Sequence, residues 1–384
     1  MDKVIPYGRQ YIDQEDIDAV VEVLRGDWLT QGPKVEEFER AVAEYCGARY
    51  AIAFNSGTSA LHGAMYAAGV GPGDEVLTAP ITFAASANAA VYLGARPRFV
   101  DIDISTYCIH IDKIEASISE RTRAIVPVDY AGYPLDIETV NDIARRHGLV
   151  VIEDAAHALG ARRATAGRPA AGQPLGSQAD MTILSFHPVK HITTGEGGMV
   201  LTDQVEFYKK MMVFRTHGIT KDPGSMQEDH GPWYYEMQDL GYNYRLTDIQ
   251  STLGRSQLKK LEGFVAQRNR LAERYNEALA GTSWIQTPPP APAGSRHAYH
   301  LYPILVSPEM DRRKVFDYLR GKGIGVQVHY IPVHLHPYYR RCFGCRPGDF
   351  PVSEGFYARE ISLPMFPGLS LADQDRVVET LINF

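Results

Sequence analysis

The chain has 384 residues, which allows one large and one smaller domain, and its content of 45% hydrophobic and 22% charged residues is ordinary for a globular protein. The net charge of -7, without a run of Lys or Arg, excludes the basic footprint of a nucleic-acid-binding protein, and no apolar stretch is long enough to span a bilayer. The first residues lack the apolar segment of a secretion signal and cysteines are few, so we expect a cytoplasmic protein.

Short β-branched segments alternate with helical patterns through the first half of the chain. After an amphipathic helix over 13–28, the pattern predicts strands at 75–80, 95–102, 123–131, 149–158, 182–187 and 197–202. Helical patterns follow the first three strands, at 83–94, 110–122 and 136–148. Several strands are nearly continuous apolar runs, as expected where helices cover both faces of a sheet. The alternation predicts an α/β fold with a mostly parallel, doubly wound sheet.

The pattern changes after residue 247. Residues 248–281 are helical, a Pro-rich break follows at 287–294, and later segments predict strands at 300–306 and 324–331 and helices at 311–323 and 371–384. We therefore expect an N-terminal segment with a large α/β domain in 1–247, and a connecting helix with a smaller α+β domain in 248–384. The Ala-, Gly- and Pro-rich stretch at 161–176 is interpreted as a loop.

Three short segments carry candidate chemistry. NSGTSAL at 55–61 leads into a helix, and the free N–H groups of a helix start bind phosphate, with added hydroxyls from Thr58 and Ser59. Asp154 ends an apolar strand, at the edge where open α/β sheets bind ligands. Lys190 lies in SFHPVKHITTGEGG at 185–198, among small and turn-forming residues. Each feature alone has an ordinary alternative: a capped helix, an N-cap carboxylate or a surface lysine.

The order of these three segments is more informative than any one of them. Pyridoxal phosphate needs backbone N–H groups for its phosphate and an aspartate that keeps its ring nitrogen protonated. Its aldehyde needs a lysine for a Schiff base. The three segments supply these groups, so they predict a pyridoxal phosphate site.

With these motifs the chain resembles the DegT/DnrJ/StrS family of sugar-nucleotide aminotransferases, which are pyridoxal phosphate enzymes of fold type I. The resemblance covers nearly the whole length and rests on several long motifs in the same order. They are WLTQGPKVEEFE (28–39), NSGTSAL, PITFAASANAA (80–90), FVDID (99–103), IEDAAHALGA (152–161), SFHPVKHITTGEGG, GYNYRLTDIQ (241–250) and VHYIPVHLHPYY (328–339). The fold that it implies is a large domain with a mixed, mostly parallel sheet and a smaller C-terminal α+β domain.

The resemblance also implies roles for single residues. Lys190 would be the Schiff-base lysine and proton carrier, and Asp154 would pair with the pyridinium nitrogen. Thr58, Ser59 and Ser185 would hold the phosphate.

Further matching residues would surround the ring and the substrate. Phe83 would stack on the ring, and His157 would pack against the cofactor and orient it. Asn243 would reach the phosphate from the neighbouring subunit, which implies a homodimer with shared active sites. His329 and Tyr330 would lie on the substrate side. The ordinary alternatives are a core position for Phe83 and a buried structural role for His329.

Cys342 and Cys345 form a C-x-x-C with histidines upstream, which raises the alternative of a metal site. A lone C-x-x-C is a weak signal, so we interpret it as two free thiols in a loop and expect no metal.

The implied reaction moves the amino group of L-glutamate to a keto-sugar nucleotide. The lysine motif at 185–198 and the strings at 299–304 and 327–339 most resemble the branch of the family that makes the pseudaminic acid precursor, whose acceptor is a UDP-linked 2-acetamido-2,6-dideoxy-4-keto hexose. The alternatives are another 3- or 4-keto nucleotide sugar, a pyridoxal phosphate-dependent sugar 3-dehydratase and a non-catalytic sugar sensor. The dehydratases carry histidine in place of the lysine, so Lys190 argues against that alternative, although His191 lies beside it.

Overall fold

The computed structural model describes residues 4–165 and 168–384, and within these ranges seven strands form the main sheet in the order β1-β9-β8-β5-β4-β2-β3. Their bounds are β1 Tyr50–Phe54, β2 Glu75–Thr78, β3 Arg96–Phe99, β4 Thr122–Val126, β5 Val150–Asp154, β8 Met181–Ser185 and β9 Gly198–Thr202. Among these strands, only β9 pairs antiparallel, with β1 and β8. The predicted α/β fold with a mostly parallel sheet is confirmed.

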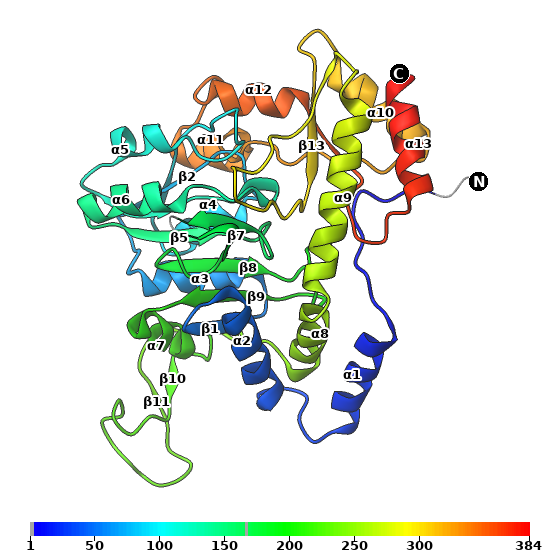
Figure 1. Ribbon diagram of the computed structural model, residues 1–384. Helices are drawn as coiled ribbons and strands as arrows, with labels where there is room; N and C mark the ends of the chain where they lie inside the picture. Colours follow the sequence, from blue (N-terminus) through cyan, green and yellow to red (C-terminus); the bar gives the residue numbers. More distant parts are fainter. Residues whose placement is uncertain (1–3, 166–167) are drawn as a thin grey trace.

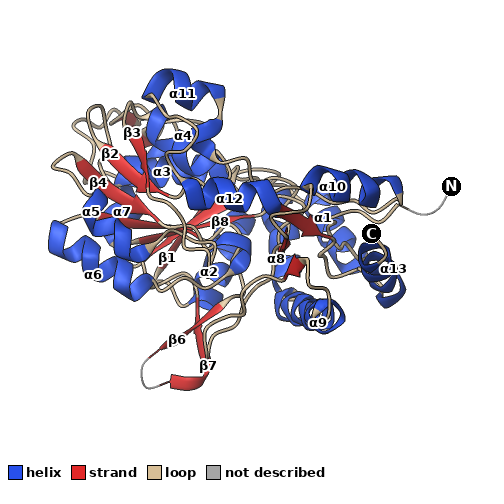
Figure 2. Ribbon diagram, turned by 90° about the horizontal axis from the view of Figure 1, so that it is seen from above, coloured by secondary structure: helices blue, strands red, loops and turns tan. Residues whose placement is uncertain are grey.

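Helices cover both faces of this sheet (Figures 1 and 2). On one face, Ile52 and Phe54 of β1 belong to a core that includes α3, α4 and α7. On the other face, Leu184 and Leu201 pack with α2, and Val151 packs with α6. Because both faces are buried, these strands are apolar at nearly every position. The helix bounds here are α1 Gln14–Arg25, α2 Pro33–Cys46, α3 Gly57–Ala67, α4 Ala85–Tyr92, α5 Ile114–Ser117, α6 Ile137–His147 and α7 Val205–Phe214, with 3₁₀ turns at Ile111–Lys113 and Tyr130–Gly132.

The chain beyond residue 247 adds a second, three-stranded sheet, β12-β13-β14, with its own apolar core. Thr247 caps α8, and the long α9 runs from beside the main sheet to the second sheet (Figure 1). The domain boundary at 247/248 stays a prediction. The bounds are α8 Asp248–Leu258, α9 Leu261–Leu279, β12 Ile285–Gln286, β13 Tyr302–Val306, α10 Arg312–Gly321, α11 Pro337–Phe343, α12 Pro351–Arg359, β14 Glu360–Leu363 and α13 Leu371–Ile382, with a 3₁₀ turn at Val333–Leu335.

Two predicted elements differ from the structure, and one strand was missed. The strand expected at 324–331 is wrong: this segment makes only isolated bridges, such as Gln327 to Ser362, and the N–H of His329 donates to the Glu360 side chain instead of to a strand. One edge of the second sheet is β14, which the pattern did not indicate. The helix expected at 110–122 is limited to the short turns between 111 and 117.

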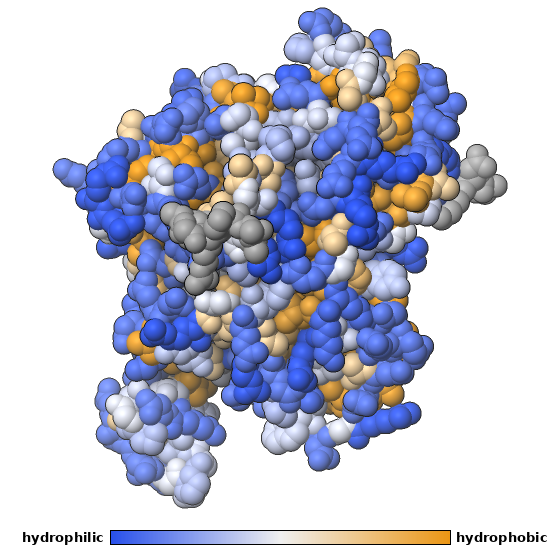
Figure 3. Space-filling model, in the orientation of Figure 1, coloured by the Kyte–Doolittle hydropathy of each residue, from blue (hydrophilic) through white to orange (hydrophobic). Residues whose placement is uncertain are grey.

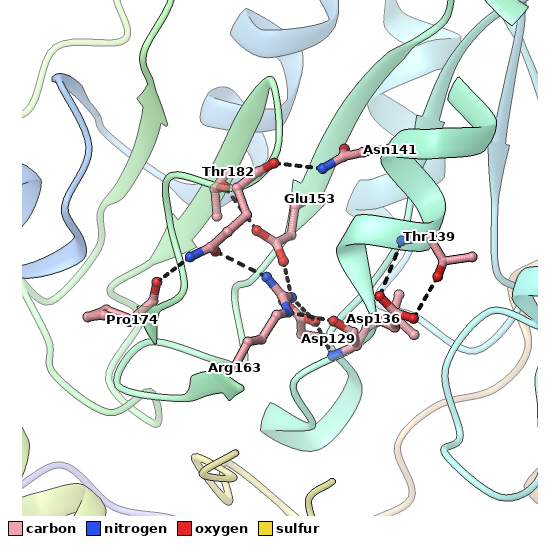
Figure 4. Close-up of polar contacts among 10 residues, drawn as sticks. Asp129, Asp136, Thr139, Asn141, Glu153, Arg163, Pro174 and Thr182 are labelled. Atoms are coloured by element: carbon pink, nitrogen blue, oxygen red, sulfur yellow. Dashed lines mark hydrogen bonds and ion pairs between the residues drawn. The ribbon is translucent and has the colours of Figure 1, made fainter. Parts of the chain in front are cut away.

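The loop expected at 161–176 is also wrong, since this stretch contains a hairpin of β6 (Arg162–Thr165) and β7 (Arg168–Pro174) that projects from the body (Figure 2). Arg163 anchors its base. Its guanidinium donates to the buried carboxylates of Asp129 and Glu153 and to the Leu135 carbonyl (Figure 4). Composition alone does not indicate such an anchor.

A second projection, the arm, is the segment 219–240 that contains β10 (Ile219–Thr220) and β11 (Glu236–Met237). It extends away from the main sheet as a separate lobe (Figures 1 and 3). The arm exposes large apolar side chains, among them Trp233, Met237 and Leu240. In the part of the chain that the structure describes, we find no helix with the length and apolar character needed to cross a membrane.

Candidate active site

A cavity of about 830 Å³ opens where the C-terminal ends of β5 and β8 meet the start of α3. This is the edge of the sheet at which open α/β folds bind ligands. Eight of the ten residues that the sequence nominated line it: Thr58, Phe83, Asp154, His157, Ser185, Lys190, His329 and Tyr330. Ser59 and Asn243 do not line it.

The start of α3 presents free donors to the cavity. Ser56 caps the helix and accepts from the N–H of Ser59, while the N–H groups of Gly57 and Thr58 donate to nothing in the described chain. The backbone comes close here because of glycines: a Cβ on Gly198 would lie 2.4 Å from the Ser56 carbonyl oxygen, and one on Gly57 would lie 3.2 Å from Cβ of Ser185. These donors at a helix start suit an anion.

Ser59 takes part in the cap of α3. Its hydroxyl donates to Oδ1 of Asn55 at 2.7 Å and accepts from the N–H of Ser56 at 3.0 Å, so it completes the cap and is buried behind the cavity wall. Thr58 and Ser185 do face the cavity. A phosphate contact of Ser59 stays a prediction.

Asp154 ends β5 with a buried carboxylate that faces the cavity. Oδ2 accepts from the Ser86 hydroxyl at 2.6 Å, and Oδ1 accepts from the N–H of Ala156 at 3.2 Å. Burial raises the pKa of Asp154, although these two hydrogen bonds and the charge of Lys190 oppose the shift. A buried carboxylate with this environment is stabilised by a cationic N–H partner.

Lys190 lies in the turn that follows β8, with its N–H bonded to the His187 carbonyl. Its Nζ is 3.4 Å from Nε2 of His300. Burial lowers the pKa of the Lys190 amine to about 8, helped by the charge of Arg268 and opposed by Asp154. A lysine with this pKa is partly deprotonated near neutral pH, and its neutral amine is a nucleophile.

The small polar residues after Lys190 hold its loop in place. The Thr193 hydroxyl and the backbone N–H of Thr194 each donate to the Phe186 carbonyl at 3.0 Å. Thr193 also accepts from the N–H of Gly195, which has a φ of 80°. Side chains thus satisfy backbone groups that have no strand partner, and this explains the composition of the motif.

His157 is buried beside the cavity and neutral, since burial lowers its pKa well below 6.5. Its Nδ1 accepts from the N–H of Ala131, so Nε2 carries the proton and donates to the Tyr330 hydroxyl at 3.0 Å. Ala131 has a left-handed φ of 56° in a turn that Asp129 and Arg163 hold in place (Figure 4).

Phe83 is not a core residue. Its side chain is 61% exposed and lies in the loop before α4, with its ring centroid 6.0 Å from that of Tyr330. An exposed aromatic ring on the wall of a cavity is available to stack on a planar ligand.

His329 and Tyr330 close the cavity from a segment that lies beside the second sheet. Nδ1 of His329 lies 2.8 Å from the Ser362 hydroxyl, and the Tyr130 hydroxyl donates to the His329 carbonyl. Burial lowers the pKa of His329 to about 3, so the ring is neutral.

Asn243 is exposed and does not itself line this chain's cavity, although it contacts Asn55, which does. Its carbonyl accepts from Nδ2 of Asn55 at 3.3 Å, which fixes its segment beside the start of α3. Its side chain is exposed, so a contact with the cavity of a second subunit stays a prediction.

Sequence reasoning missed several residues of this site. Ser86 bonds Asp154, His300 contacts Lys190, and Arg268 is a buried cation that donates to the carbonyls of Tyr299, His300 and Met365. Ser86 stands in the motif PITFAASANAA, but only its position after folding shows its partner. Across the described chain, no cluster of three His, Cys, Asp or Glu side chains is arranged to hold a metal ion.

The residues fit pyridoxal phosphate. Free N–H groups at the start of α3 suit its phosphate, the buried Asp154 suits a protonated ring nitrogen, and Lys190 has a lowered pKa beside them.

The family model described as DegT/DnrJ/EryC1/StrS aminotransferase family matches residues 10–382. An uncharacterized protein of Methanocaldococcus jannaschii is 43% identical over 380 residues, which cover 98% of this chain and 96% of that protein. The spore coat polysaccharide biosynthesis protein SpsC of Bacillus subtilis is 40% identical over 381 residues (98% and 96%). A UDP-4-amino-4,6-dideoxy-N-acetyl-beta-L-altrosamine transaminase of Campylobacter jejuni is 38% identical over 385 residues (99% and 97%).

Solved structures agree with these similarities. Helicobacter pylori PseC, an aminotransferase involved in the biosynthesis of pseudoaminic acid, superimposes with a TM-score of 0.90 at 34% identity and covers 99% of both chains. The PLP-form of the putative sugar aminotransferase Spr1654 from Streptococcus pneumoniae gives a TM-score of 0.90 at 31% identity, with 99% of this chain and 98% of that chain covered.

Proposed function

The chain belongs to the DegT/DnrJ/EryC1/StrS aminotransferase family, and we propose that it uses pyridoxal phosphate to move the amino group of L-glutamate to the C4 keto group of a UDP-linked 4-keto-6-deoxy sugar. The acceptor that we favour is UDP-2-acetamido-2,6-dideoxy-beta-L-arabino-hex-4-ulose, a precursor of pseudaminic acid. One observation carries the proposal: Lys190 and Asp154 line one cavity beside the free N–H groups of α3.

Different residues of the cavity would contact different parts of the cofactor. The N–H groups of Gly57 and Thr58 and the Ser185 hydroxyl would bind the phosphate. Asp154 would keep the ring nitrogen protonated, and Phe83 would stack on the ring. Pyridoxal phosphate supplies the electron sink that stabilises negative charge on the carbon next to the amino group.

Lys190 would carry the proton between carbon atoms. Its amine has a pKa of about 8, so it gains and loses a proton within the physiological range. His157 holds Tyr330 at the wall of the cavity and remains neutral, so it adds no charge that would compete with Asp154.

The sugar assignment rests on similarity. The names of the Campylobacter jejuni and Helicobacter pylori relatives, a UDP-amino-dideoxy-sugar transaminase and an aminotransferase of pseudoaminic acid biosynthesis, favour the 4-keto-6-deoxy acceptor. The cavity lies toward the upper end of ligand-pocket volumes, which suits a cofactor together with a nucleotide sugar. A different keto-sugar nucleotide is the second candidate, since the slightly more similar Bacillus subtilis protein is named for spore coat polysaccharide synthesis.

We further propose that the enzyme is a homodimer of the cytoplasm. The arm and residues Trp28 and Leu29 expose apolar side chains that a second subunit would cover. Asn243 is also exposed, so its side chain is available to a second subunit. All four cysteines lie in the described chain and are free, which suits a reducing compartment.

A spectroscopic titration tests the reaction. The protein is loaded with pyridoxal phosphate, and its visible absorption is followed while L-glutamate and then the UDP-4-keto sugar are added. We expect glutamate to remove the visible band and the sugar to restore it, with a sugar product that has gained nitrogen by mass spectrometry. Consumption of the sugar without gain of nitrogen would favour a dehydratase, and no response to the sugar would rule out this acceptor.

A further inference from the structure

Three side chains connect the interior of the second sheet to the cavity: Glu360 and Ser362 of β14, and His329. All three are buried. Oγ of Ser362 lies 2.6 Å from Oε1 of Glu360 and 2.8 Å from Nδ1 of His329. Oε2 of Glu360 accepts from the backbone N–H of His329 at 2.8 Å, which fixes the carboxyl group. The three groups therefore form a continuous hydrogen-bonded chain, from here on the Glu360 chain.

The hydroxyl in the middle gives the Glu360 chain two orientations. If Glu360 is ionised, Ser362 donates to it and accepts from Nδ1–H of His329, so Nε2 of the ring is an acceptor. If Glu360 is protonated, it donates to Ser362, and Ser362 donates to Nδ1, so Nε2 carries the proton and is a donor. Both orientations satisfy the carboxyl group, the hydroxyl and Nδ1 of the ring.

The cavity end of the Glu360 chain is open. The His329 ring lines the cavity, and its Nε2 has no partner among the residues that the structure describes. Two contacts hold this residue in place. The Tyr130 hydroxyl donates to the His329 carbonyl, and the centroid of the Tyr7 ring lies 5.5 Å from the centroid of the His329 ring. A ligand in the cavity thus meets Nε2 of His329, and the groups bonded to Nδ1 determine whether Nε2 donates or accepts a hydrogen bond.

Glu360 is able to change protonation state near neutral pH. It has no ion-pair partner in the described chain, and burial raises its pKa to about 8, opposed by Ser362, the His329 N–H and the more distant Arg312. The other titratable groups around it are Tyr107, Tyr130, Tyr330 and Arg359, and burial raises the pKa of each of these tyrosines. None of the three tyrosines ionises near neutral pH.

We propose that Glu360, acting through Ser362, sets whether His329 presents a hydrogen-bond donor or an acceptor to the substrate cavity. Glu360 and Ser362 are positioning residues, since neither lines the cavity. The chemical use of this switch rests on the proposed function: amino transfer replaces a keto oxygen, which only accepts hydrogen bonds, with an amine, which also donates. A ring that exchanges roles suits both the keto substrate and the amino product.

The test is a measurement of the His329 tautomer, which needs no substrate. Protein labelled with ¹⁵N-histidine is observed by NMR from pH 6 to 10, and the ring is assigned with His329→Gln. We expect Nε2 to carry the proton below about pH 8 and Nδ1 to carry it above. In Glu360→Gln, the amide oxygen would accept from the His329 N–H and the amide nitrogen would donate to Ser362, so Nε2 would stay protonated at every pH.

Ser362→Ala is a second variant that interrupts the Glu360 chain, and it should abolish the pH-dependent exchange even if Glu360→Gln folds poorly. Glu354→Gln is the matched control, because Glu354 pairs with Nε2 of His334 at 3.0 Å outside the cavity. It should leave the His329 signals unchanged. The same tautomer at every pH in the parent protein, or an unchanged exchange in Glu360→Gln, would overturn the proposal. A wrong sugar assignment would not alter this result, so the two failures are distinguishable.

Discussion

Nζ of Lys190 lies 3.4 Å from Nε2 of His300, and both groups are deprotonated more readily than in water because they share a buried site. Burial lowers the pKa of His300 well below 6.5, so His300 is neutral and adds no positive charge beside the lysine. The lysine is therefore partly deprotonated near neutral pH, and several expectations follow from the identity and environment of Lys190.

Lys190→Ala should abolish amino transfer and leave the fold intact, because the side chain extends into the cavity from a loop that its threonines hold. Borohydride reduction of the loaded parent protein, followed by peptide mass spectrometry, should place the cofactor on residue 190, and the variant should carry none. Circular dichroism supplies the folding control. Turnover retained by the variant would contradict the assignment.

The capture of pyridoxal phosphate should depend on pH through Lys190. The Lys190 amine has a pKa of about 8 and is mostly protonated at lower pH. The rate of cofactor capture should therefore rise about tenfold per pH unit and level off above pH 8. An unperturbed lysine would give a rise that continues beyond pH 10. Stopped-flow absorbance on the cofactor-free protein measures the profile. A rate that still rises at pH 9.5 would show that the lysine is not desolvated as in the structure.

The chemistry-bearing motifs were predictable from sequence because each is local. A helix start, a strand end and a loop lysine each have a short pattern, and their order indicated one cofactor. The main strands were predictable for the same reason, as the apolar runs are continuous. The strand β1, YAIAF, was missed, since two of its five residues are alanines with weak strand preference.

The partners of these motifs were not predictable, because they depend on contacts between distant segments. Ser86 reaches Asp154 across 68 positions, and His300 reaches Lys190 across 110. The β6–β7 hairpin depends on a buried Arg163, whose partners come from other strands. No periodicity in the sequence encodes these contacts.

Asp154→Asn should make the cofactor-free protein more stable and the enzyme less active. An acid whose pKa is raised by folding stabilises the protein fully only below its unfolded pKa, and this contribution is lost as pH rises through the folded pKa. At pH 7.5 the cofactor-free variant should therefore unfold at a higher temperature than the parent protein. The transfer rate should fall by roughly 100-fold or more, a loss of about 2.7 kcal/mol or more of transition-state stabilisation.

Differential scanning fluorimetry from pH 7.5 down to about pH 4, with and without pyridoxal phosphate, checks this prediction. The stability gain should shrink as the pH falls toward the ordinary pKa of an aspartate, and added cofactor should stabilise the parent protein more than the variant. Ser86→Ala is the matched control, since it removes the donor at 2.6 Å but keeps the carboxylate. If Asp154→Asn destabilised the cofactor-free protein at pH 7.5, the carboxylate would be a structural group and not one that a cationic ligand stabilises.

Mixing two inactive variants tests whether active sites are shared between subunits. Lys190→Ala removes the lysine of its own cavity, and Asn243→Ala removes a surface side chain that we expect to act in the partner's cavity. In a mixed dimer, one of the two sites then contains both native residues. Random exchange gives half mixed dimers, so about one quarter of the parent activity should return.

The exchange needs subunits that separate and reassemble, for example by brief treatment with denaturant, and sedimentation should report a dimer before and after. Leu240→Asp in the arm is the companion variant, because a charge on this exposed apolar residue should weaken a dimer that buries it. A chain that sediments as a monomer would exclude shared sites. Activity below a few per cent in a well-mixed dimer would mean that Asn243 serves its own cavity or none.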